Sequence, residues 1–102
     1  MSYLVDYEGH DMTPTDEALT AIRARRALQD AKWGVQHHKP GMWRLILDEE
    51  LGEVARAVLE DDGNLRNELV DAAAVLVAWI ECLDAQPSAG DDKAYPPKQR
   101  SK

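Results

Sequence analysis

The sequence predicts an all-α protein built from about three main helices in one domain. Long stretches of the 102-residue chain place apolar residues or strong helix formers at helical spacing, and turn-forming residues separate these stretches. The chain is 44% hydrophobic, so a small core can form. A chain this short buries a modest fraction of its surface alone, and we expect oligomerisation to complete the helical bundle.

The first helix is expected to start at Thr13 and to run to about residue 32. Thr13 can cap the N-terminus, Pro14 suits the first helical position, and Asp16 can return to the cap in a capping box. The residues that follow contain no helix breaker. Residues 1–12 show no helical period, and we expect them to form an N-terminal arm before a helical domain over residues 13–86.

A loop is expected over residues 32–42, because Gly34, Pro40 and Gly41 interrupt the helical pattern. Several of its side chains can stack or form hydrogen bonds, namely Trp33, Gln36, His37, His38 and Lys39. A structural reading stands beside a functional one, since Trp33 and Trp43 can be core residues at helix ends. A histidine-bound metal is disfavoured, because neighbouring side chains diverge and no third ligand lies at zinc spacing.

The second helix is expected from Met42 to about Glu60, where apolar residues recur every three or four positions. Glu50 and Glu53 lie close to this apolar stripe, and Glu49 lies one position round the helix. Gly52 costs about 1 kcal/mol relative to alanine inside a helix. We therefore expect its small size to serve close helix packing or a ligand.

The third helix is expected from about Asn64 to Asp84, after a turn at residues 61–64. Its middle, residues 69–80, is apolar nearly all round, which predicts burial on most sides and an oligomer interface. Asp71 is the exception, and an acid there needs a metal ion, a basic partner or a proton. Residues 87–102 are rich in Pro, Gly, Ser and charge, and we expect a disordered tail.

Four acids form two pairs, Glu50 with Glu53 and Glu68 with Asp71. Residues three apart share a helix face, and helices joined by a short turn run antiparallel, so the two pairs can face each other. The bland alternative is a solvated helix face. Facing carboxylates repel unless cations lie among them, and oxygen ligands suit Mg²⁺ or Mn²⁺. Since magnesium often completes its shell with phosphate oxygens, the acids suggest a phosphorylated substrate.

Charge and composition exclude other classes of function. The net charge of −7 argues against a general nucleic-acid binder. No stretch is long and apolar enough to span a membrane, and the N-terminus has no signal-peptide pattern. The single cysteine, Cys82, cannot form a disulfide within the chain, which suits a reduced compartment. We therefore expect a cytoplasmic protein without nucleic-acid or membrane partners.

The acid pattern resembles that of a known family. Glu49-Glu50-Leu51-Gly52-Glu53, followed by Glu68-Leu69-Val70-Asp71, resembles the EExxE…ExxD pattern of the MazG-like, all-α nucleoside triphosphate pyrophosphohydrolases. The segment Trp33-Gly34-Val35-Gln36-His37, with Trp43, Ile46 and Leu47, is similar to small single-domain members, including those of bacteriophages. The resemblance covers roughly residues 27–83. In this chain apolar residues follow Asp71, so groups that bind phosphate must come from elsewhere.

The resemblance implies a four-helix-bundle type of fold, completed as a homodimer or homotetramer. It implies Mg²⁺ bound by Glu50, Glu53, Glu68 and Asp71, with Glu49, Glu50 and Glu53 as catalytic acids and Glu49 orienting the attacking water. The reaction would convert a (deoxy)nucleoside triphosphate to the monophosphate and pyrophosphate, in the host cytoplasm if the protein is phage-encoded. A purine such as dGTP is favoured, because two tryptophans, Trp33 and Trp43, could grip a large base. Position in the sequence alone, rather than the resemblance, suggests the residues that would bind the substrate, namely Lys32, Trp33, Gln36, His37 and Trp43.

Three alternatives stay open at this point. The enzyme can be pyrimidine-specific, acting on a nucleotide such as dUTP. The chain can be a helical dimerisation or regulatory module that kept the bundle and lost the chemistry. It can also be a passive metal-binding bundle, which would bind the cation without turnover.

Overall fold

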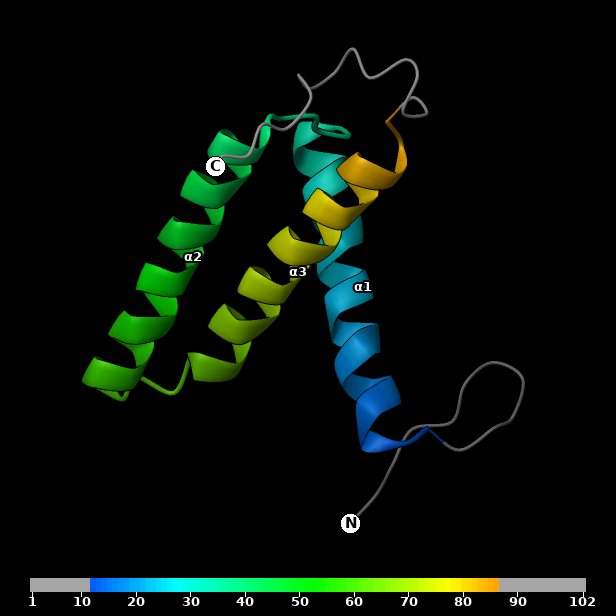
Figure 1. Ribbon diagram of the computed structural model, residues 1–102. Helices are drawn as coiled ribbons and strands as arrows, with labels where there is room; N and C mark the ends of the chain where they lie inside the picture. The colour runs from blue at the N-terminus through cyan, green and yellow to red at the C-terminus, as the bar shows by residue number, and fades with distance from the viewer. Residues whose placement is uncertain (1–11, 87–102) are drawn as a thin grey trace.

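The structure is a computed structural model that describes residues 12–86, and within this range every regular element is an α-helix (Figure 1). The three helices are α1 (Pro14–Trp33), α2 (Pro40–Glu60) and α3 (Leu65–Asp84). For the described residues, the prediction of an all-α fold with three helices is confirmed. The predicted N-terminal arm, except for Met12, and the predicted tail lie outside the described residues.

Helix α1 begins as its capping residues predict. The Thr13 hydroxyl accepts a hydrogen bond from the Asp16 backbone N–H at 3.1 Å, and the Asp16 carboxylate accepts one from the Thr13 N–H at 3.0 Å. The reciprocal pair satisfies N–H groups that a helix start otherwise leaves unpaired. The helix ends at Trp33 and is capped by Gly34, whose φ of 76° is accessible to glycine at little cost.

Helix α2 begins at Pro40, two residues before the predicted start, so the expectation of a loop as far as residue 42 was wrong. Proline has no N–H, and the first helical position needs none, so Pro40 starts this helix rather than ending a loop. Gly41 lies in the same first turn. The connection between α1 and α2 is therefore the short segment 34–39.

The predicted turn between α2 and α3 is confirmed. Asp61 closes α2 with a left-handed φ of 50°, and Gly63 has a φ of 77°. The Asp62 carboxylate accepts a hydrogen bond from the Asn64 backbone N–H at 2.9 Å, which is the turn that Asp and Asn favour. The turn sends α3 back alongside α2 (Figure 1).

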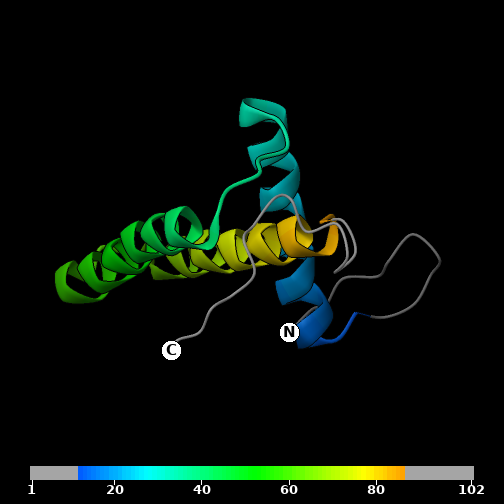
Figure 2. The ribbon, with the colours of Figure 1, turned by 45° about the horizontal axis from the view of Figure 1, so that its top comes forward.

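Helix α3 is the central element of the described chain. Both α1 and α2 pack against it, whereas α1 and α2 do not pack against each other. Figure 2 shows α2 and α3 running side by side while α1 crosses α3 steeply. The core lies between α2 and α3, where Trp43, Val75 and Cys82 are buried, with Ile46, Leu47, Ala78 and Trp79 packed around them.

One face of α3 remains exposed within a single chain. Large apolar side chains on it have exposed fractions between 38% and 56%; they are Leu65, Leu69, Leu76, Ile80 and Leu83. Their spacings of four, seven, four and three residues place them on one stripe of the helix. One chain therefore leaves part of this apolar helix uncovered, as its composition predicts.

Gly52 does not serve close packing within the described chain. A Cβ atom built at this position would meet nothing within 4 Å. Among the described helices, none is long and apolar enough to cross a membrane.

Candidate functional site

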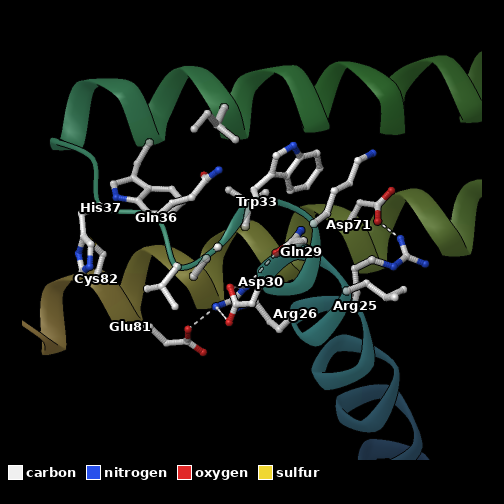
Figure 3. Close-up of a pocket in the computed structure, with 18 of the residues that line it drawn as sticks. Arg25, Arg26, Gln29, Asp30, Trp33, Gln36, His37, Asp71, Glu81 and Cys82 are labelled. Atoms are coloured by element: carbon white, nitrogen blue, oxygen red, sulfur yellow. Dashed lines mark hydrogen bonds and ion pairs between the residues drawn. The ribbon is translucent and has the colours of Figure 1, made fainter.

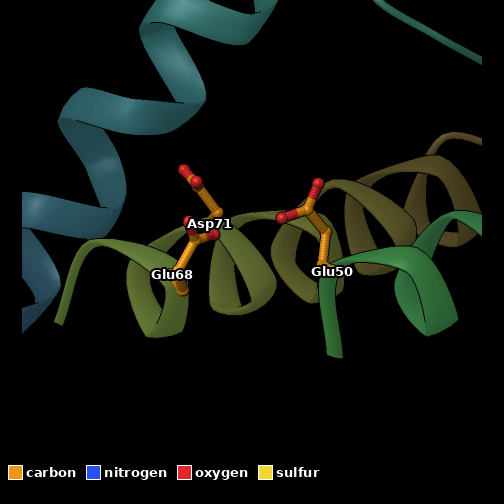
Figure 4. Close-up of side chains that lie close together, drawn as sticks. All are labelled: Glu50, Glu68 and Asp71. Carbon is orange, nitrogen blue, oxygen red and sulfur yellow. The ribbon is translucent and has the colours of Figure 1, made fainter. Parts of the chain in front are cut away.

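Three of the four predicted acids meet between α2 and α3. Glu50 comes from α2, and Glu68 and Asp71 come from neighbouring turns of α3 (Figure 4). One carboxylate oxygen from each of the three lies within 4.8 Å of the others, and all three side chains are half-buried. The spacing of the acids on antiparallel helices predicted this meeting, and we call the group the acid trio.

The fourth predicted acid, Glu53, lies outside the acid trio. Its carboxylate forms an ion pair with Arg56 at 3.0 Å, one turn further along the exposed side of α2. Its side chain is 42% exposed. Glu49 is exposed too and lines the cavity described below.

The three members of the acid trio differ in their partners. Asp71 forms an ion pair with Arg25 of α1. Glu68 accepts a hydrogen bond from the Asn64 amide at 2.8 Å. Glu50 has no hydrogen bond or ion pair with any residue of the described range 12–86.

The electrostatics of the acid trio are unbalanced at Glu50. Burial of its carboxyl raises the pKa of Glu50, and the negative charges of Glu68, Glu53 and Glu49 raise this pKa further. Arg25 acts in the opposite direction but does not cancel the rise. More negative charge is therefore gathered here than the described basic residues neutralise.

Glu50 and Asp71 of the acid trio line a cavity of about 810 Å³, to which all three helices and the segment 34–39 contribute residues. Figure 3 shows Asp71 and Arg25 at one end of this cavity and His37 and Cys82 at the other. Its wall is mixed: carboxylates and basic groups from α1 to α3 stand beside Trp33, Ile46 and Val75. Such a wall can contact both a charged group and a flat apolar one.

The predicted substrate-binding residues divide into two groups. Four of them line the cavity from α1 and the following segment, namely Lys32, Trp33, Gln36 and His37. Trp33 is 59% exposed, and the Lys32 Nζ lies 4.7 Å from the centre of its ring. The Trp33 ring therefore has an accessible face.

Trp43 belongs to the core, as the structural reading of this residue predicts. It touches the cavity wall but is only 2% exposed. Its ring stacks on Trp79 with centroids 6.4 Å apart and meets the His38 ring edge-on at 4.9 Å. With these faces occupied, Trp43 shapes the cavity from behind.

The polar groups of the 34–39 segment have partners inside the chain. The Gln36 side-chain oxygen lies 3.0 Å from His38 Nε2. His37 Nδ1 lies 4.0 Å from the buried Cys82 Sγ, which also donates to the His38 carbonyl at 3.7 Å. These contacts attach the segment to α3 and fix the end of the cavity that lies away from the acid trio.

Two arginines of the site, Arg25 and Arg26, were not among the predicted site residues. Arg25 lines the cavity and pairs with Asp71. Arg26 is buried and holds α1 on α3, because it binds both Asp30 oxygens at 3.0 and 3.2 Å and also donates to Glu81. These acceptors, Glu81 first, raise the pKa of Arg26 against the opposing effect of burial. The need of Asp71 for a basic partner was the one sequence signal for Arg25.

The residues present fit a hard divalent cation. The acid trio offers carboxylate oxygens alone, within one ion's reach of each other, and such ligands suit Mg²⁺ or Mn²⁺ rather than zinc. Among residues 12–86, Glu50 has no partner of its own, and burial first, then the neighbouring negative charges, raise its pKa. A cation there would relieve that repulsion.

Comparison of the chain with family models, curated proteins and solved structures found no match.

Proposed function

We propose that this protein is a Mg²⁺-dependent nucleotide pyrophosphohydrolase of the MazG-like type. It would convert a (deoxy)nucleoside triphosphate, with a purine such as dGTP favoured, to the monophosphate and pyrophosphate. The observation that carries the proposal is the acid trio, two of whose members, Glu50 and Asp71, line a cavity of about 810 Å³, with Glu50 unpartnered among residues 12–86. Ligand cavities of this kind commonly measure roughly 300–1,000 Å³.

The acids have distinct parts in this proposal. Glu50, Glu68 and Asp71 would hold Mg²⁺ (or Mn²⁺), which supplies positive charge to phosphate oxygens and increases the acidity of water. Glu53 would be the fourth acid of the pattern. Its exposed ion pair with Arg56 is of a kind that contributes little to stability, so breaking that pair would cost little. Glu49 is exposed at the cavity and would accept a proton from the attacking water.

The base-binding part of the proposal rests on Trp33. Its exposed ring can stack on a nucleobase, and the larger surface of a purine would gain more from that contact. Lys32, beside the ring, can meet a phosphate, while Gln36 and His37 lie on the same wall and can contact the base edge. A pyrimidine such as dUTP is the alternative within the same chemistry.

We also propose that the protein is a homodimer or homotetramer in which the exposed stripe of α3 is covered and a four-helix bundle is completed. The support is the row of exposed apolar side chains from Leu65 to Leu83. Leu76→Glu should reduce the mass measured by sedimentation equilibrium to that of a monomer. Leu19→Glu, a similarly exposed position on α1, should leave the mass unchanged.

The test of the reaction is phosphorus NMR of the protein with each common NTP and dNTP, in Mg²⁺ and in EDTA. We expect pyrophosphate and a monophosphate with Mg²⁺ only, and their loss in Glu50→Gln. Release of inorganic phosphate would reject the proposed cleavage position. Absence of turnover on every nucleotide would reject the enzyme.

One observation favours a second candidate, the helical dimerisation or regulatory module without catalysis. The ion pair with Arg25 gives Asp71 a partner without any metal ion, so an acid in this apolar run does not by itself require one. This candidate predicts neither turnover nor Mg²⁺ binding. A passive metal-binding bundle predicts Mg²⁺ binding without turnover, and calorimetry separates the two.

A further inference from the structure

Arg25 lines the cavity and forms an ion pair with one member of the acid trio. It reaches from α1 to Asp71 on α3 (Figure 3), and the two side chains are 30% and 29% exposed. Both line the cavity, as do Gln29 and Lys32, which follow Arg25 by four and seven residues on α1. The guanidinium therefore lies on a face of α1 directed toward the cavity.

The neighbouring Arg26 shows by contrast that Arg25 can be released. Arg26 is held by Asp30, Gln29 and Glu81, and its side chain is 11% exposed. Within the described residues, Asp71 is the one ion-pair partner of Arg25. Breaking that one pair frees Arg25, whereas freeing Arg26 would detach α1 from α3.

A cation held by the acid trio and the Arg25 guanidinium would compete for Asp71. Both are positive, and both would be attracted to the Asp71 carboxylate. If they shared its two oxygens, the interaction of Asp71 with each of them would be weaker. A phosphate offers the planar guanidinium another anionic acceptor that it can bind in a bidentate manner. Since apolar residues follow Asp71 along α3, that helix supplies no other basic group to meet a phosphate beyond this point.

We propose that Arg25 is an exchangeable counter-ion, paired with Asp71 in the metal-free protein and transferred to a substrate phosphate once a divalent cation occupies the acid trio. The inference rests on the proposed function and deepens it, because it names a phosphate-binding residue and couples it to the metal. Arg25 thus stabilises the empty site and limits its affinity for a cation in the absence of substrate. Substrate binding removes that limit.

The test uses calorimetry on the full chain with two probes, Mg²⁺ alone and inorganic triphosphate in the presence of Mg²⁺. Arg25→Gln should bind Mg²⁺ alone several-fold more tightly, because its competitor for Asp71 is gone. It should bind triphosphate about tenfold or more weakly, which is the loss expected for a charge-assisted contact. Arg23→Gln removes the same charge from an exposed position of α1 and should change neither affinity.

Arg25→Lys keeps the charge beside Asp71 and guards against a loss of folding in Arg25→Gln. It should retain the wild-type affinity for Mg²⁺ alone but bind triphosphate more weakly, since an ammonium group cannot form the bidentate contact. Unchanged Mg²⁺ affinity in Arg25→Gln would overturn the counter-ion, and unchanged triphosphate affinity would overturn the phosphate contact. If the wild-type protein binds no Mg²⁺, the proposed function fails as well, which distinguishes the two failures.

Discussion

Replacing Glu50 by glutamine should stabilise the metal-free protein, although it removes a residue of the proposed active site. Glu50 has no hydrogen bond or ion pair within residues 12–86, so the substitution breaks no observed contact. It does remove a charge that faces Glu68, while the charge of Asp71 is already offset by Arg25. The expected effect therefore combines the loss of a charge that is costly to bury with the loss of its repulsion from Glu68.

The magnitude follows from the geometry of the acid trio. Two unit charges 4.8 Å apart repel by about 1 kcal/mol in water and by about 3.5 kcal/mol at an effective dielectric constant near 20. Because the side chains are half-buried, we expect a value near the lower limit, about 1–2 kcal/mol in the free energy of unfolding. Loss of the burial penalty on the charge acts in the same direction.

The assay is urea unfolding followed by circular dichroism at one protein concentration, in EDTA and in saturating Mg²⁺. In EDTA, Glu50→Gln should exceed the wild-type protein in stability, whereas Glu49→Gln, exposed and outside the acid trio, should change it by under about 0.5 kcal/mol. In Mg²⁺ at 100 times its Kd, the wild-type protein should gain about 2.7 kcal/mol and Glu50→Gln much less. A destabilised Glu50→Gln in EDTA, or an equal gain in Mg²⁺, would refute this reasoning.

Four further predictions each concern a single residue. Because folding raises the pKa of Glu50, the stability that this group contributes is complete below its unfolded pKa near 4.5 and is lost as the pH rises through the higher folded pKa. In EDTA, the advantage of Glu50→Gln over the wild-type protein in the free energy of unfolding should therefore grow with pH. Glu81→Gln should lower the free energy of unfolding by about 1 kcal/mol, because it weakens the clamp between α1 and α3; a cost no larger than that of an exposed control would argue against the clamp. Trp33→Ala should raise the KM for a nucleotide about tenfold at nearly constant thermal stability, since the side chain is 59% exposed, and an unchanged KM would count against stacking. Gly52→Ala should stabilise α2 by up to about 1 kcal/mol, and destabilisation or a changed mass would instead reveal a second chain packed at this position.

Local sequence features were sufficient to predict the helices. The Thr13–Asp16 capping box and the turn at residues 61–64 are interactions between close neighbours, and both occur as expected. The start of α2 was misplaced because proline and glycine were read as loop residues. Pro40 is compatible with a first helical turn, and only its context distinguishes these two uses.

The meeting of the acid trio could be predicted from the sequence, whereas the contact of Arg25 with Asp71 could not. Spacing along two antiparallel helices joined by a short turn determines which residues of α2 and α3 meet, so Glu50, Glu68 and Asp71 could be grouped from the sequence. The contact of Arg25 with Asp71 depends on how α1 crosses α3 (Figure 2), and no local period encodes that crossing. Glu53 was grouped with the acid trio because helical periodicity predicts which face of a helix a residue lies on. It does not predict that Arg56 forms an ion pair with the Glu53 carboxylate.

Because Asp71 is paired with Arg25, Glu50 rather than Asp71 is the acid that most needs a metal ion. An acid in an apolar run needs a metal, a basic partner or a proton, and Asp71 has a basic partner. Glu50 has none among residues 12–86, and its neighbours make ionisation harder. We expect a purely structural bundle to be more stable with a neutral or apolar side chain at this position, so the carboxylate of Glu50 has a cost that stability does not explain. A divalent cation would offset that cost, which makes Glu50 the residue on which the enzyme and the inactive module differ most.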